Sequence, residues 1–145
     1  MNVARMSAAT ALLLSLALAV PAAAGTIEVD DARAEMMEGK TDRGDIFMKI
    51  TNGGSTADRL YAVRTKAAKK AALETESEEN VLAGESSETA SLLVKPGETV
   101  ELTEEGAHIE LFGLKKQFES GESFPATLFF ELDGPVSVTV TVEEE

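Results

Sequence analysis

Residues 136–142 read Val136-Ser137-Val138-Thr139-Val140-Thr141-Val142, an unbroken alternation of valine with polar residues. Successive side chains of a strand point to opposite faces of the sheet, so this period of two places all four valines on one face. Valine and threonine are β-branched and favour extended backbone. The stretch therefore predicts a half-buried β-strand, and it is the clearest local signal in the chain.

A turn and a second strand precede this stretch. Leu132-Asp133-Gly134-Pro135 combines residue types that favour tight turns, and Ala126-Thr127-Leu128-Phe129-Phe130 before it is another strand candidate. We expect the two strands to form a hairpin. Similar strands are expected at residues 26–29, 45–51, 59–63, 91–94, 99–102 and 108–112, with turn signals between several of them. Short strands with frequent turns predict an all-β sandwich or barrel.

Two neighbouring segments depart from this pattern. Residues 65–74 are rich in alanine and lysine, which have high helix propensity, so a short helix is expected there. Residues 75–90 are dominated by glutamate, serine and threonine and contain few apolar side chains. Such a composition predicts an exposed loop.

The N-terminus has the layout of a secretory signal. Arg5 supplies a positive charge, residues 11–20 are almost entirely apolar, and Pro21-Ala22-Ala23-Ala24 provides small residues for cleavage. The apolar run is shorter than the roughly 20 residues that a membrane-spanning helix needs. We therefore predict a cleavable signal peptide at residues 1–24, one exported domain at residues 25–145, and no membrane span in the mature chain.

Composition narrows the classes of function. The chain has 13 basic and 26 acidic residues, a formal net charge of −13, which repels phosphate backbones and argues against a nucleic-acid partner. It has no cysteine, so the sequence offers no disulfide, no thiolate metal ligand and no cysteine for N-terminal lipid attachment. An acidic surface aids solubility or attracts cations or a basic partner, and composition alone does not choose between these roles.

No enzyme class is indicated. His108 is the only histidine, no serine lies in a nucleophile-elbow pattern, and phosphate-binding and EF-hand motifs are absent from the sequence. Among 26 acidic residues, carboxylate pairs arise by chance, and none is singled out. The remaining candidate is His108 with Glu110, because on a strand the two share one face while Ile109 and Leu111 share the other. They could reach one metal ion, or they could be a polar surface pair above an apolar core.

The order of motifs resembles the periplasmic copper chaperone family PCu(A)C. The resemblance includes Gly106-Ala107-His108-Ile109-Glu110-Leu111-Phe112-Gly113 and extends over most of the predicted mature domain. Each matching segment is a weak signal alone, but together they follow the family's order. The segments are residues 44–54, 57–60, 95–102, 106–115 and 120–131.

This resemblance implies a cupredoxin-like antiparallel β-sandwich in the periplasm that binds a copper ion, usually Cu(I). It also implies a periplasmic or membrane protein that receives the copper. The family's ligands are a His or Met, a Met about eleven positions on, and a His-x-Met pair. His108 matches the histidine of that pair, and Glu110 stands in place of its methionine. The two earlier positions fall on Thr75, beside Glu74, and Ser86, beside Glu85.

Loss of the thioether ligands should weaken Cu(I) binding, because carboxylate and hydroxyl oxygens prefer harder ions. Two interpretations remain open. In the first, Glu74, Glu85, His108 and Glu110 form an altered metal site, for a copper ion or for Zn(II). In the second, the same fold binds no metal and acts as a protein-interaction module.

Overall fold

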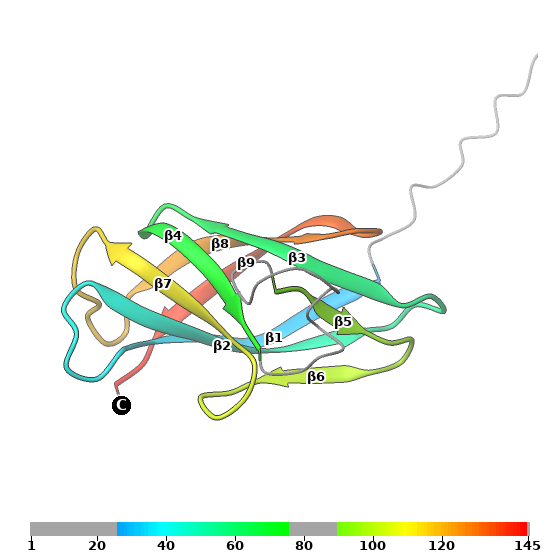
Figure 1. Ribbon diagram of the computed structural model, residues 1–145, viewed down its shortest axis with the longest axis horizontal. Coiled ribbons are helices and arrows are strands. Elements are labelled where there is room, and N and C mark those ends of the chain that lie inside the picture. Colours follow the sequence, from blue (N-terminus) through cyan, green and yellow to red (C-terminus); the bar gives the residue numbers. More distant parts are fainter. Residues whose placement is uncertain (1–25, 76–89, 145) are drawn as a thin grey trace, which may run out of the picture.

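The computed structural model describes residues 26–75 and 90–144, and these residues form nine β-strands with no helix among them (Figure 1). The all-β prediction is confirmed. Every expected strand is present, most with longer bounds than expected. The strands are β1 (Ile27–Met36), β2 (Arg43–Asn52), β3 (Asp58–Thr65), β4 (Ala68–Glu74), β5 (Leu92–Val94), β6 (Thr99–Leu102), β7 (His108–Leu114), β8 (Ser123–Phe130) and β9 (Gly134–Val142).

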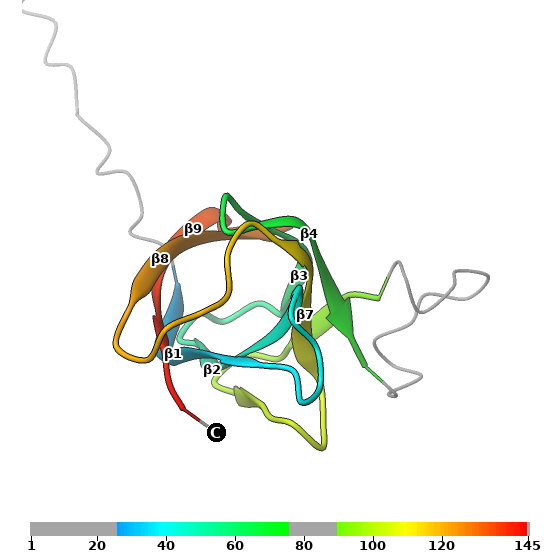
Figure 2. The same ribbon diagram turned by 90° about the vertical axis from the view of Figure 1, so that its left-hand side faces the viewer.

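The strands form one sheet that curves around a common interior. Its hydrogen-bonded order is β4-β7-β2-β1-β9-β8-β3-β5, and β6 pairs with β2. β3 and β4 are joined by two residues and contact each other, which brings the two sides of the sheet together. The view along the molecule shows the strands arranged in a ring (Figure 2). The fold is therefore a nearly closed barrel.

Strand pairing is antiparallel with one exception in the described sheet. β1 runs parallel to β9, with Arg33 opposite Thr141 and Ala34 opposite Val142. The Glu143 N–H extends the contact by donating to the Ala34 carbonyl at 2.9 Å. The predicted antiparallel arrangement is thus correct everywhere except where the first strand meets the last.

The predicted hairpin at the C-terminal end of the domain is confirmed by the pairing of β8 with β9. Gly134 has a φ of 75°, a conformation that costs glycine little. A buried carboxylate, Asp58 at the start of β3, accepts hydrogen bonds from the Leu132 and Asp133 N–H groups, both at 2.9 Å, and from the Arg59 N–H at 2.7 Å. Asp58 therefore anchors the hairpin turn to β3.

The expected helix at residues 65–74 is wrong. β3 ends at Thr65, and β4 occupies Ala68–Glu74, paired antiparallel with β7. Ala68, Ala72 and Leu73 are buried in this pairing. The local preference of alanine and lysine for helix is worth only tenths of a kcal/mol per residue, so burial and ladder hydrogen bonds override it.

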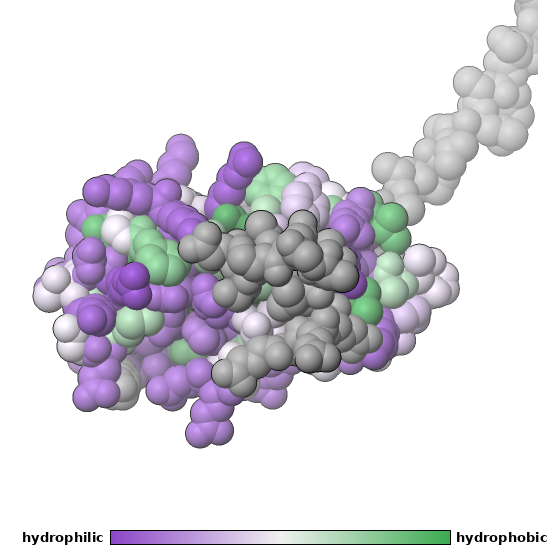
Figure 3. Space-filling model, viewed as in Figure 1, coloured by the Kyte–Doolittle hydropathy of each residue, from purple (hydrophilic) through white to green (hydrophobic). Residues whose placement is uncertain are grey.

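The core lies inside the curved sheet and contains apolar residues from every strand. Val140 and Val142 of the alternating C-terminal stretch are buried, and Val136 and Val138 pack partly buried against the cluster. Hydrophilic residues predominate on the face in Figure 3, with small apolar areas among them. The largest side chains almost fully enclosed are Phe130, Ile46, Met48, Ile50, Leu60, Leu92, Leu102, Ile109, Leu111 and Leu128.

Two predictions fall largely outside the described residues. These are the signal peptide at residues 1–24 and the loop at residues 75–90, of which only Thr75 and Ala90 are described. Within residues 26–75 and 90–144 there is no helix long and apolar enough to cross a membrane.

Candidate metal-binding site

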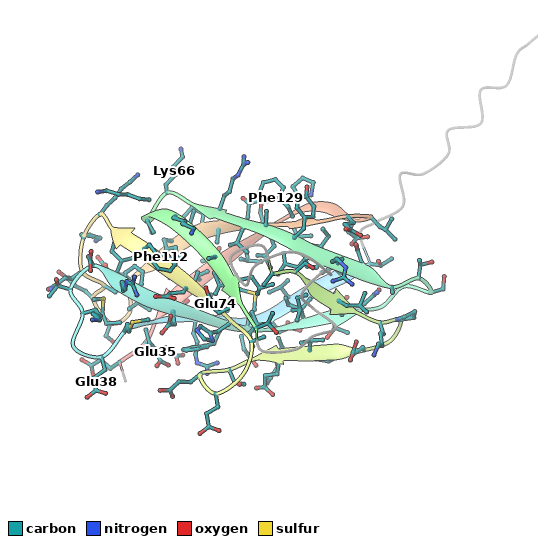
Figure 4. The ribbon with its side chains drawn as sticks, viewed as in Figure 1. Glu35, Glu38, Lys66, Glu74, Phe112 and Phe129 are labelled. Carbon is teal, nitrogen blue, oxygen red and sulfur yellow. The ribbon has the colours of Figure 1, made fainter. Side chains whose placement is uncertain are left out.

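The pairing of β4 with β7 brings two of the predicted ligands face to face. Glu74, the last residue of β4, lies directly opposite His108, the first residue of β7, and Ala72 lies opposite Glu110 (Figure 4 labels Glu74). On its other side β7 pairs with β2, where Asp45 lies opposite Glu110. The strand register therefore gathers acidic and imidazole groups at one end of this part of the sheet.

Glu74, His108 and Glu110 line an open pocket of about 440 Å³, which we call the acidic pocket. Four of its lining residues are glutamates and one is the histidine, and none is a lysine or an arginine. Such a set favours a cation over an anion. The lining residues are Glu74, Thr75, Glu104, Glu105, Gly106, His108 and Glu110.

The His108 ring is held so that one nitrogen is available. Nδ1 lies 2.9 Å from the Gly106 carbonyl oxygen. A carbonyl can only accept a hydrogen bond, so this contact favours the tautomer with the proton on Nδ1 and the lone pair on Nε2. The ring also packs against Phe47, with centroids 6.3 Å apart. Metal-binding histidines are commonly oriented by such a second hydrogen bond.

Glu110 already forms an ion pair with the side chain of Arg43. Its Oε1 accepts a hydrogen bond from Arg43 Nη1 at 2.9 Å, and its side chain is only 13% exposed. The Arg43 guanidinium also stacks over the Phe112 ring, 4.5 Å from its centroid. Oε1 is therefore used to hold Arg43, which leaves Oε2 for any further contact.

The sequence did not identify Asp45, which belongs to the same neighbourhood. Burial raises the pKa of its carboxyl, the charge of His108 lowers it, and the nearby acidic side chains Glu110, Glu104 and Glu35 raise it further. Its Oδ1 is buried and has no hydrogen-bond partner among the described residues. Period two in β2 places Asp45 on the outer face with Phe47, but only the register with β7 shows that it faces Glu110.

The three methionines of the described residues lie outside the acidic pocket. Met48 is buried in the core, while Met36 and Met37 line an adjoining hollow with Asp45, and Glu104 borders both spaces. The nearest described thioethers therefore belong to a separate hollow.

The structure brings Glu74, His108 and Glu110 to one pocket, while Glu85 lies outside the described residues. Within the described ranges no group of three or more histidine and carboxylate side chains is close enough to hold a metal ion as it stands. A metal site here needs rotation of side chains around His108. The assignment of all four residues as ligands stays a prediction.

Residues 27–142 match a family model described as "Putative lipoprotein LpqE-like". The chain belongs to the LpqE-like family. No curated protein sequence matches this LpqE-like chain.

Solved structures share its fold. The copper-bound PCuAC domain from PmoF2 has a TM-score of 0.69 and 23% identity, covering 86% of this chain and 97% of that domain. The apo PCuAC domain from PmoF1 has a TM-score of 0.71 and 24% identity, with coverages of 83% and 96%. The Cu(I) form of DR1885 from Deinococcus radiodurans has a TM-score of 0.66 and 24% identity, with coverages of 88% and 81%. The predicted resemblance to PCu(A)C domains is thus confirmed for the fold.

Proposed function

We propose that this LpqE-like protein is an exported metal carrier of the copper-chaperone type, in which His108 is the central ligand of an altered site. The observation that carries the proposal is the pairing of Glu74 with His108 within the acidic pocket. Two structures with the same fold are described as holding copper, PmoF2 and DR1885. The protein has no proposed catalytic role.

The available donor atoms determine which metal is preferred. His108 offers Nε2, a borderline ligand, and the glutamates of the pocket offer carboxylate oxygens, which are hard ligands. Imidazole with carboxylates suits Cu(II) or Zn(II) better than Cu(I), which prefers sulfur. We propose Glu74 and Glu110 as oxygen ligands, and Glu85 as a fourth from the segment next to β4. The open pocket leaves room for a copper-receiving protein to approach the ion.

Export is part of this proposal. Residues 1–24 direct the chain out of the cytoplasm, and the family description as lipoproteins supports an extracytoplasmic location. Because the 145 residues contain no cysteine to carry a lipid, we propose release by cleavage after Ala24, most simply into a periplasm. N-terminal sequencing of the exported protein tests this step.

The decisive experiment is a titration of residues 25–145 with Cu(II), Zn(II) and Cu(I), each against a competing chelator. We expect Cu(II) or Zn(II) to bind more tightly than micromolar, and His108→Ala to weaken binding by about tenfold or more, because it removes the imidazole ligand. Glu74→Gln should also weaken binding. Its matched control is Glu119→Gln, an exposed glutamate outside the acidic pocket, which should not.

Two results would contradict the proposal that the protein is a metal carrier. One is binding no tighter than micromolar for all three ions, which would favour the interaction module. The other is unchanged affinity in His108→Ala. Tight Cu(I) binding that is lost in Met36→Leu or Met37→Leu would instead move the site to the adjoining methionine hollow.

A further inference from the structure

A second pocket lies at the opposite end of β4 and β7 from the acidic pocket. β4 begins two residues after Lys66 and ends at Glu74, and both residues are labelled in Figure 4. The Lys115 N–H, just beyond β7, donates to the Ala67 carbonyl at 3.0 Å, so the β3–β4 turn meets the chain that leaves β7. A hollow of about 350 Å³ lies there, within the range of small-molecule sites.

The segments that lead to this pocket are rich in basic residues although the chain as a whole is acidic. Residues 60–73 and 111–118 together contain six basic and no acidic residues. Two of these basic side chains form cation–π contacts. The Arg64 guanidinium lies 5.2 Å from the centroid of the Phe129 ring, and the Lys70 ammonium lies 5.3 Å from that of Phe112. The six are Arg64, Lys66, Lys69, Lys70, Lys115 and Lys116.

The hollow combines an aromatic floor with a cationic rim. Phe118 and Phe124 stack with centroids 5.1 Å apart and an interplanar angle of 18°. Three lysines surround them, and one, Lys116, is paired with Glu122 at 2.5 Å. Lys66 and Lys115 have no ion-pair partner in the described part of the chain. The lining residues are Lys66, Ala67, Lys115, Lys116, Phe118, Glu122, Ser123, Phe124 and Pro125, which we call the basic pocket.

We propose that the basic pocket binds a small organic anion with an apolar body, such as a carboxylate on a short acyl chain. The phenylalanine rings and Pro125 would cover the apolar body, and the ammonium groups of Lys66 and Lys115 would pair with the anionic head. The acidic residue of the lining, Glu122, is paired with Lys116. Repulsion from acidic groups farther away is screened beyond about 8 Å at physiological salt, so the field at the rim comes mainly from Lys66 and Lys115. The proposal is independent of the metal site at the other end of the strands.

Three probe ligands test the charged contact and the apolar contact separately. Octanoate has both the anion and the apolar body, acetate has only the anion, and octylammonium has the same body with the opposite charge. We expect octanoate to shift the NMR amide signals of residues 115–124 in a saturable way. Acetate and octylammonium should each bind at least about tenfold more weakly than octanoate, because each lacks one of the two contacts.

Matched variants test the residues. Lys66→Gln/Lys115→Gln should weaken octanoate binding by about tenfold, because both side chains are exposed at the rim and supply the charge. Lys40→Gln removes one positive charge from the β1–β2 turn, outside the pocket, and should bind octanoate normally. The proposal is wrong if the double variant binds octanoate as the parent does. It is also wrong if octylammonium or acetate matches octanoate, or if octanoate shifts no signals of the basic pocket.

Discussion

At the scale of single residues, Asp45 shows how a half-buried carboxylate affects stability. Burial raises its pKa, so the folded state disfavours the charged form. Below the ordinary pKa of 3.8 the carboxyl is protonated in both the folded and the unfolded chain, so its ionisation does not change the free energy of unfolding. Above its folded pKa the carboxyl is ionised in both states, and its burial lowers the free energy of unfolding by the full amount. Asp45 therefore destabilises the fold at neutral pH relative to acid.

We predict that Asp45→Asn raises the free energy of unfolding at pH 7, by under about 1 kcal/mol because the group keeps part of its hydration. The gain should shrink as the pH falls toward the ordinary value of 3.8, because the raised pKa makes Asp45 take up its proton in the folded protein at a higher pH than in the unfolded chain. Urea unfolding of metal-free protein at both pH values measures it. Asp42→Asn, an exposed aspartate of the β1–β2 turn, is the control. Destabilisation by Asp45→Asn at pH 7 that disappears at the lower pH would show instead that the ionised carboxylate makes a stabilising contact.

His108 and Glu110 show which part of the candidate site was predictable. Period two alone fixes that they share a face, and the structure confirms this, since both line the acidic pocket. The proximity of Glu74 depended on the family resemblance, because no local rule gives the register between β4 and β7. Asp45 was missed for the same reason. Its neighbours are set by pairing between strands far apart in sequence.

At the scale of elements, β9 and β4 mark the limits of reading strands from sequence. The valines of β9 alternate because one face packs on the core and the other is exposed, so the pattern was plain. In β4 the buried positions are not alternate: Ala72 and Leu73 are adjacent and both enclosed. The helix propensity of alanine and lysine was then the stronger local signal. Only the presence of β7 beside it makes the segment a strand.

The hairpin of β8 and β9 depends on one buried carboxylate. Replacing Asp58 with alanine leaves three backbone N–H groups without their acceptor, two of them in the turn. We predict a loss of about 2–4 kcal/mol in the free energy of unfolding, since buried donors without partners are costly. Asp58→Asn keeps one acceptor oxygen and should lose less. Thermal and urea unfolding compare the two, and equal stability of Asp58→Ala and the parent would refute the anchoring role.

At the scale of the whole molecule, the strands β4 and β7 separate two pockets of opposite character. The acidic pocket with His108 lies at one end and the basic pocket with Lys66 and Lys115 at the other. The net charge of −13 does not reveal this difference, because the six basic residues of 60–73 and 111–118 are outnumbered by acidic residues in the rest of the chain. Composition could suggest attraction for cations, but only the fold shows that three lysines line a pocket with two stacked phenylalanines.

The sheet also depends on its last strand, because β9 pairs with both β8 and β1. We predict that a chain ending at residue 134 loses cooperative unfolding, since β8 and β1 would each lack a neighbour and the core would lose Val140 and Val142. A chain ending at Glu143 retains the ladder and should fold. Circular dichroism during thermal unfolding distinguishes the two, and a cooperative transition in the shorter chain would contradict the prediction.

The parallel contact between β1 and β9 has a consequence for how the protein is made. A ribosome synthesises β1 first and β9 last, so β1 waits for its second neighbour until nearly the whole domain has been produced. Closing a contact over more than a hundred residues is slow compared with forming a local hairpin. The growing chain thus stays incompletely folded throughout its synthesis. An incompletely folded chain is the form that the proposed export requires, because a secretion channel is narrow. On that proposal, the barrel closes only after export.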